Sequence, residues 1–278
     1  MDRPRPIVAY KTYARRAKKM GTYISHFRIA ESLLIALENL EDQAFLFGNL
    51  APDSGTPNED WSHFNPPRTI THFLGPGEGE GEGEGKIKDM EFRRQYMLGT
   101  DAGKEDCCYS FFLGYFFHLV CDTLWSSWIV KASILQYESI IREKEANAWS
   151  EIRQDWHDLD RKYFRDHSQL EIWRLMKSLH NPPECLEYLP QEVMRQQMDY
   201  IEHVYLKPKE GKRLDRGYPY LAEATMDRFV KESTQIIIEI MQRRDELMRS
   251  DSNTALSIFE SERMLPYEYP LGDMSKPV

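Results

Sequence analysis

Residues 107–130 read CCYSFFLGYFFHLVCDTLWSSWIV, a nearly uninterrupted apolar run. The run is almost long enough to span a lipid bilayer. However, His118 and Asp122 lie at its centre, where ionisable side chains are costly in lipid, and the chain has no second run of this kind. The run therefore predicts a buried central helix in a soluble protein without a transmembrane segment.

The segments around this run also predict helices. In residues 22–40, TYISHFRIAESLLIALENL, apolar side chains recur at the spacing of one helix face. Further helical patterns cover residues 42–50, 88–99, 104–135, 138–179, 190–207 and 219–249. Clear strand alternation is absent from the sequence. The sequence thus predicts an all-α fold, with a single multi-helix domain over residues 1–278.

Three segments are predicted to lie outside helices. Residues 53–73 are rich in Pro, Asn and Gly, which predicts a loop. Residues 77–86, GEGEGEGEGK, offer nothing to pack and have high backbone entropy, so they predict a disordered, flexible acidic insert within the domain. Residues 251–278 predict an extended tail.

Charge and cysteine usage bear on partners and location. The formal net charge of −9 argues against nucleic-acid binding, which needs a basic surface. The first 27 residues lack the apolar run of a signal peptide. The four cysteines show no CxxC spacing, which is typical of reduced, buried thiols; they are Cys107, Cys108, Cys121 and Cys185. We therefore expect a cytoplasmic protein, and the oligomeric state is left open.

The strongest chemical signal is the pair His118 and Asp122. Residues four apart on a helix project from the same face, so an imidazole nitrogen and a carboxylate oxygen can reach one metal ion. The neighbouring side chains are apolar, and an unpaired carboxylate would be costly there. The alternative is a His–Asp hydrogen bond without metal.

Other candidate ligands occur in three further segments. His26 opens the first predicted helix, where the alternative is a core or capping histidine. Asp53 follows a proline, where the alternative is an N-cap or turn carboxylate. His63 and His72 lie in the Pro-rich loop, and we prefer His72. Imidazole and carboxylate ligands without a thiolate favour zinc, with manganese or iron as alternatives.

Four motifs occur in a familiar order: SHFRIAESLL, GNLAPDSG, THF and LGYFFHLVCD. This order resembles the bacterial zinc-dependent phospholipase C family, which is related to the single-strand-specific zinc nucleases. The resemblance covers roughly residues 22–130 and implies the all-α fold of that family. It also implies a set of metal ligands, namely His26, Asp53, His72, His118 and Asp122. In this set His26 would serve a second ion that Asp122 bridges to the first.

The sequence also departs from that family. The secreted enzymes use a mature N-terminal amine as a ligand, whereas here 25 residues precede His26. The family takes further histidines from beyond the helix pair, but residues 123–130 contain none. The nearest downstream candidates are His157 and Asp160 in DWHDLD. We therefore expect one or two ions rather than a three-metal centre.

The resulting functional prediction is a metal-dependent, phospholipase C-like phosphoester hydrolase that uses a metal-activated water. Asp53 would be a ligand and the candidate catalytic base, and Arg68 a candidate phosphate contact. The substrate would be a small phosphoester or a phospholipid head group. One alternative is a non-catalytic, metal-stabilised binding protein. The other is a helical metallohydrolase built on the dipeptide His157–Asp158.

Overall fold

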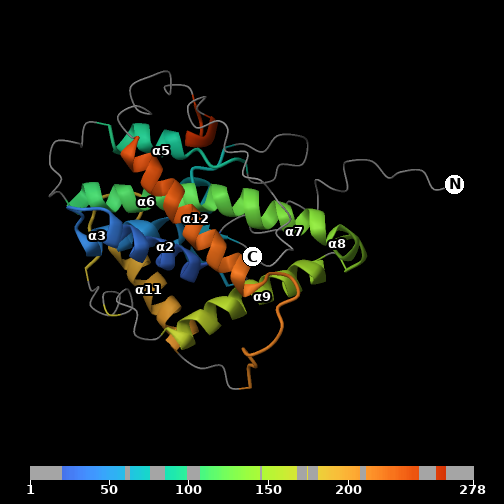
Figure 1. Cartoon of the computed structure of the whole chain (residues 1–278). Helices are drawn as coiled ribbons and strands as arrows, with labels where there is room; N and C mark the ends of the chain where they lie inside the picture. Colours follow the sequence, from blue (N-terminus) through green and yellow to red (C-terminus); the bar gives the residue numbers. More distant parts are fainter. Residues whose placement is uncertain are drawn as a thin grey trace.

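The apolar run forms helix α6 (Cys107–Trp125), which continues through a π-helical turn, η2 (Ser126–Val130), into α7 (Lys131–Gln136). In the computed structural model this helical stretch runs across the middle of the protein (Figure 1). By length and composition it could cross a membrane, but 83% of its most apolar window is buried within the protein. Such burial is expected of a core helix. The structure describes residues 21–59, 63–75, 85–98, 107–144, 146–167, 174, 181–206, 211–243 and 255–260.

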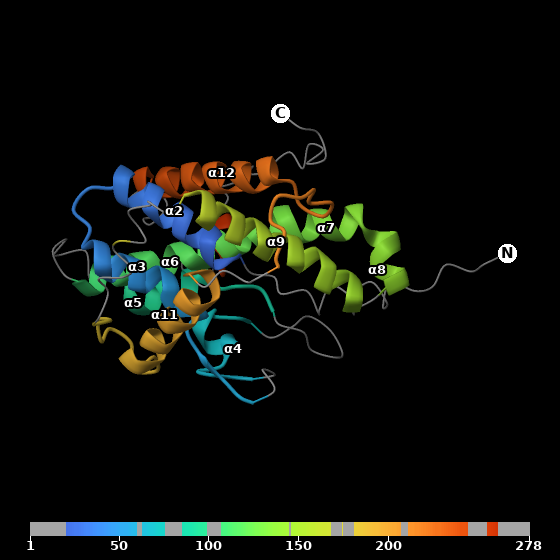
Figure 2. The same cartoon turned by 90° about the horizontal axis from the view of Figure 1, so that it is seen from below.

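The other described helices are α2 (Tyr23–Ala36), α3 (Asp42–Leu50), η1 (Ala51–Asp53), α4 (Arg68–Thr71), α5 (Asp89–Tyr96), α8 (Glu138–Lys144), α9 (Ala146–Asp166), α11 (Gln191–Leu206), α12 (Glu223–Gln242) and η3 (Ile258–Glu260). Helices α2, α3, α5 and α12 and the short η1 pack against α6, and the other described helices complete the fold. Helices α12 and α11 lie on opposite sides of α6 (Figure 2). The structure is mostly helical, which confirms the all-α prediction. The division into one domain stays a prediction.

Two of the non-helical predictions need correction. The loop after Asp53 contains a small antiparallel pair of strands, β1 (Thr56–Pro57) and β2 (Phe64–Asn65), and then α4. The predicted extended tail contains the short helix η3. The start of η3 is held in place by the buried carboxylate of Asp89, which accepts hydrogen bonds from Ser257 Oγ at 2.6 Å and Ile258 N at 2.8 Å. Most of the acidic insert, the rest of the tail and residues 1–20 lie outside the described residues.

Two glycines allow α3 and α6 to approach each other closely. A Cβ atom at Gly48 would lie 1.9 Å from the carbonyl oxygen of Phe111 on α6. One at Gly114 would lie 2.1 Å from the carbonyl oxygen of Phe45 on α3. Both distances are far shorter than any real Cβ contact, so only glycine permits this packing. The close approach brings the C-terminal end of α3 against the middle of α6.

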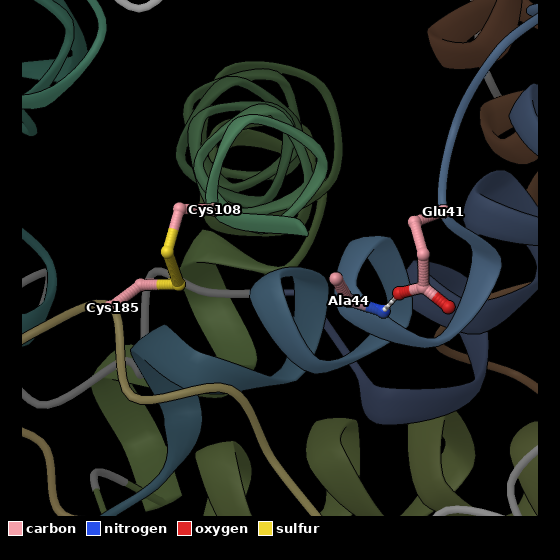
Figure 3. The surroundings of a disulfide bond; sticks show 4 residues. All are labelled: Glu41, Ala44, Cys108 and Cys185. Atoms are coloured by element: carbon pink, nitrogen blue, oxygen red, sulfur yellow. Dashed lines mark hydrogen bonds between the residues drawn. A yellow bond between two sulfur atoms is a disulfide. The ribbon is translucent and has the colours of Figure 1, made fainter. Parts of the chain in front are cut away.

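A disulfide ties the N-terminal end of α6 to the segment before α11. It joins Cys108 to Cys185, with the Cα atoms 5.6 Å apart (Figure 3). The prediction of reduced thiols is therefore wrong for these two residues, whereas Cys107 and Cys121 are free. Sequence spacing could not reveal the bond, since 77 residues separate its cysteines. Disulfides are rare in the cytosol, so this bond does not favour the predicted cytoplasmic location, which stays a prediction.

We expect Gly114→Ala to destabilise the protein by about 3 kcal/mol or more, because the added methyl group forces two helix backbones apart. The measurement is the free energy of unfolding in urea. Gly217→Ala is the matched control, since a Cβ atom there meets nothing within 4 Å. Equal stability of the two variants would contradict the close packing of α3 and α6.

Candidate metal centre

The structure brings the five residues predicted as ligands into one buried cluster. His118 and Asp122 come from α6, His26 from α2, Asp53 from the end of η1 and His72 from the residue after α4. Four of these side chains are between 0% and 3% exposed, and that of Asp53 is 8% exposed. Two groups have all their ligand atoms within 4.8 Å of one another: His26 with Asp53 and His118, and His72 with His118 and Asp122.

The carboxylate of Asp122 lies between the histidines. Its Oδ1 is 3.1 Å from His26 Nε2 and accepts a hydrogen bond of 2.6 Å from the backbone nitrogen of Gly21. Its Oδ2 is 3.5 Å from Nε2 of both His72 and His118. These two distances exceed those of normal N–H···O hydrogen bonds. The two oxygens of Asp122 therefore face different histidines.

The ring of His118 is fixed by the backbone of α3. Its Nδ1 lies 2.7 Å from the carbonyl oxygen of Asn49. A carbonyl only accepts, so Nδ1 carries the hydrogen, and in the neutral ring Nε2 is left with a lone pair. This Nε2 faces the cluster and is buried without a hydrogen-bond partner. The sequence analysis did not identify Asn49, although it belongs to the GNLAPDSG motif.

His72 is held in a similar way from the α4 side. Its Nδ1 lies 3.0 Å from Thr71 Oγ1, while the hydroxyl of Tyr115 on α6 donates to the carbonyl oxygen of Thr71. Its Nε2 lies 3.4 Å from Asp53 Oδ1, again longer than a normal hydrogen bond. The Nε2 atom is buried without a hydrogen-bond partner in the described chain.

The unpartnered atoms show how well a metal ion suits this cluster. Three buried side-chain atoms without a hydrogen-bond partner face one another in the cluster, namely Nε2 of His72, Nε2 of His118 and Oδ2 of Asp122. Leaving such buried polar atoms unpaired is costly, and a cation would pair with all three. Two imidazole nitrogens and a carboxylate oxygen are ligands that zinc accepts. The donor set therefore fits zinc, while metal binding itself stays a prediction.

The charges of the cluster also suit a cation. Burial lowers the pKa of His26 and of His72, which favours neutral rings. Burial would also lower the pKa of His118, but Asp122 and Asp53 outweigh it and raise that pKa. Burial opposes ionisation of Asp122, yet His118 and His26 lower its pKa overall. Metal ligands must be deprotonated, so an ionised carboxylate between histidines is the required state.

Asp53 and Arg68 stand at the edge of the cluster. Arg68 Nη2 donates to Asp53 Oδ1 at 2.9 Å. Burial would raise the pKa of Asp53, but His72 and Arg68 outweigh it and hold that pKa well below its usual value. Both residues line a pocket of about 300 Å³, and Asp53 is the one member of the cluster that lines it. Asp53 is therefore the part of the cluster that borders this pocket.

The remaining candidates lie outside the cluster. His63 is exposed beside β2, which agrees with the preference for His72. His157 is exposed and lines the same pocket as Asp53. Asp158 accepts hydrogen bonds from Lys212 and Arg216 on a separate part of α9's surface.

Asp160 anchors the helix that carries His26. Its buried carboxylate accepts hydrogen bonds from Thr22 Oγ1 at 2.7 Å and from the Tyr205 hydroxyl at 2.9 Å. Thr22 is also the N-cap of α2, where its side chain accepts from the backbone nitrogen of Ser25. Asp160 therefore fixes the N-terminal end of α2 against α9 and α11, one turn before His26.

No protein-family model, curated protein or solved structure matches the chain.

We expect Asp160→Asn to flatten the dependence of stability on pH between about 4 and 7. Burial raises the pKa of Asp160 from 3.8 to about 7. In this window the folded protein keeps a proton that the unfolded chain releases, so stability falls by up to about 1.4 kcal/mol per pH unit as pH rises. Asparagine cannot ionise, so this fall disappears. Urea unfolding at several pH values measures it.

Asp89→Asn is the matched comparison, because burial also raises the pKa of Asp89 to about 7 in a different part of the fold. Both variants should lose part of the slope. An unchanged slope in Asp160→Asn alone would show that this carboxyl does not hold its proton in the folded protein.

Proposed function

We propose that this protein is a metal-dependent phosphoester hydrolase, with zinc as the metal and a phospholipase C-like centre. One observation carries the proposal: three buried, unpartnered donor atoms converge beside a pocket that contains a carboxylate and a guanidinium group. The motif order that resembles the zinc-dependent phospholipase C family supports it, because residues from all four motifs meet in this cluster.

The metal would be held by His72, His118 and Asp122. Bound zinc lowers the pKa of water to about 7 and neutralises negative charge on phosphoryl oxygens. Nδ1 of His118 and Nδ1 of His72 keep both rings oriented through Asn49 and Thr71. Such outer contacts raise ligand basicity and fix ring orientation. Manganese and iron are the alternative metals.

A second ion would depend on His26. Its ring stacks on that of His118, with centroids 3.9 Å apart and an interplanar angle of 7°. His118 can give Nε2 to a single ion, because Nδ1 is bonded to Asn49. A second ion would be held by His26, with Asp53 or with Asp122 as a bridge between the two ions. The bridging role of Asp122 is also the one that the family resemblance implies.

Asp53 and Arg68 would act on the substrate. The carboxylate of Asp53 borders the pocket and would accept a hydrogen bond from the attacking water. For Asp53 to act as the base, its bond to Arg68 would have to be released, because that bond helps to hold its pKa well below the usual value. Arg68 has a side chain 20% exposed and can donate to a phosphoryl oxygen while it holds Asp53. The substrate would be a small phosphoester or a phospholipid head group.

The non-catalytic alternative has one observation in its favour. His26, His72, His118 and Asp122 are almost completely buried, as in metal sites that serve folding. The opening at Asp53 favours the enzyme. The third hypothesis, based on His157–Asp158, has less support, because lysine and arginine side chains already occupy the carboxylate of Asp158.

We expect the wild-type protein, purified without a histidine tag, to contain about one or two equivalents of zinc. Asp122→Asn should lose this metal, because it removes the carboxylate charge while keeping the side-chain shape. Asp158→Asn is the matched control and should retain it. Elemental mass spectrometry measures the metal, and hydrolysis of p-nitrophenyl phosphate measures activity before and after chelation.

The outcomes separate the three hypotheses. Bound zinc with chelator-sensitive hydrolysis supports the enzyme. Bound zinc without hydrolysis, together with a large loss of thermal stability on chelation, supports the metal-stabilised binding protein. Loss of metal in Asp158→Asn but not in Asp122→Asn would favour the His157–Asp158 site. A wild-type protein that takes up no metal even after reloading would overturn all three.

A further inference from the structure

In the pocket beside Asp53, the charged residues that the structure describes are Asp53 and Arg68. Asp53 and Arg68 lie at the cluster and are bonded to each other. The other described residues that line the pocket are His157, Gly55, three prolines, and uncharged polar and aromatic residues. A bound phosphoester would therefore have its phosphate at the charged end and its alcohol part against the neutral walls.

The pocket disfavours a cationic alcohol such as choline or ethanolamine, because a buried cation needs an anion as its partner. The carboxylate of Asp53 is already paired with Arg68 at 2.9 Å, and the described residues that line the pocket include no other carboxylate. The described aromatic side chains that line the pocket already contact other groups. Arg68 already lies 5.9 Å from the centroid of Phe64, and the rings of Tyr23 and Tyr200 meet edge to face at 6.4 Å.

The neutral walls favour hydroxyl groups. Gln197 donates to the Tyr23 hydroxyl at 2.8 Å, and Thr56 donates to the side chain of Gln196 at 3.0 Å. These contacts hold amide and hydroxyl groups in a fixed arrangement along the pocket. Such groups both donate and accept hydrogen bonds, as the hydroxyls of a sugar or polyol do. The aromatic rings provide flat surfaces for the C–H faces of the same molecule.

The size of the pocket agrees with such a molecule. Its volume of about 300 Å³ lies at the small end of ligand pockets. This space suits a single phosphate carrying a short polyol or one sugar ring. A second phosphate would find no further lysine or arginine among the described residues that line the pocket.

We propose that this pocket selects phosphate monoesters of uncharged, hydroxyl-rich alcohols, such as polyols and sugars, over those of cationic alcohols. The selection rests on the proposed hydrolase function and names its substrate class. A cationic alcohol would find no unpaired carboxylate among the described residues that line the pocket. The row of amide and hydroxyl groups from α11, α2 and β1 would bind the hydroxyls of an uncharged alcohol.

The first test compares substrates with the zinc-loaded wild-type protein. Release of inorganic phosphate is measured from glycerol 2-phosphate and glucose 6-phosphate, and from phosphocholine and phosphoethanolamine. We expect kcat/KM to be higher for the uncharged alcohols by about tenfold or more. Equal values, or a preference for the cationic alcohols, would overturn the proposal.

A general substrate separates this proposal from the hydrolase function. p-Nitrophenyl phosphate tests hydrolysis without either kind of alcohol. If it is hydrolysed but the two classes of alcohol are not distinguished, the selection is wrong and the hydrolase function stands. If zinc-loaded protein hydrolyses neither p-nitrophenyl phosphate, nor the diester bis(p-nitrophenyl) phosphate, nor any of the four esters, the hydrolase function fails and the selection fails with it.

The second test places a negative charge in the neutral wall. Gln197→Glu keeps the side-chain shape, and the Tyr23 hydroxyl can then donate to the new carboxylate. We expect the ratio of kcat/KM for phosphocholine to that for glycerol 2-phosphate to rise by about tenfold. Gln95→Glu is the matched control, because Gln95 also donates to a tyrosine hydroxyl, that of Tyr96 at 2.9 Å, outside the pocket. A ratio unchanged in Gln197→Glu, or changed equally in both variants, would overturn the proposal.

Discussion

The close contact between α3 and α6 is the constraint on which the rest of the structure depends. Gly48 and Gly114 let the two backbones approach within distances that a methyl group would prohibit. This approach carries the backbone carbonyl of Asn49 to the ring of His118, which fixes the ring and its tautomer. After α3 the chain continues through η1, which brings Asp53 to the same cluster as His118. Helix packing and the candidate metal centre are thus one arrangement.

A buried carboxylate is the second consequence of this arrangement. Asp122 lies on the central helix with no exposure, and a charge there is stable only when it is paired. His26 and the backbone nitrogen of Gly21 satisfy one of its oxygens, while the other faces His72 and His118. The fold therefore concentrates negative charge and free imidazole nitrogens at one point. Asp160 holds α2 in place, and so keeps His26 within reach of this point.

Much of this could be predicted from the sequence, for physical reasons. Helical periodicity located the core helix, and the spacing of His118 and Asp122 placed both side chains on one face. The motif resemblance, rather than spacing, linked them to His26, Asp53 and His72. The disulfide of Cys108 and Cys185 could not be predicted, because pairing depends on the fold. The role of Asn49 was missed because a backbone carbonyl acts, and any residue type supplies one.

The central claim is that a metal ion binds between His72, His118 and Asp122. Anomalous diffraction at the zinc absorption edge, from crystals of zinc-loaded protein, tests it most directly. The account predicts a peak within about 2.2 Å of Nε2 of both histidines and of a carboxylate oxygen of Asp122. A map without a peak there, with the three side chains drawn into direct hydrogen bonds or with zinc bound elsewhere, would contradict the account.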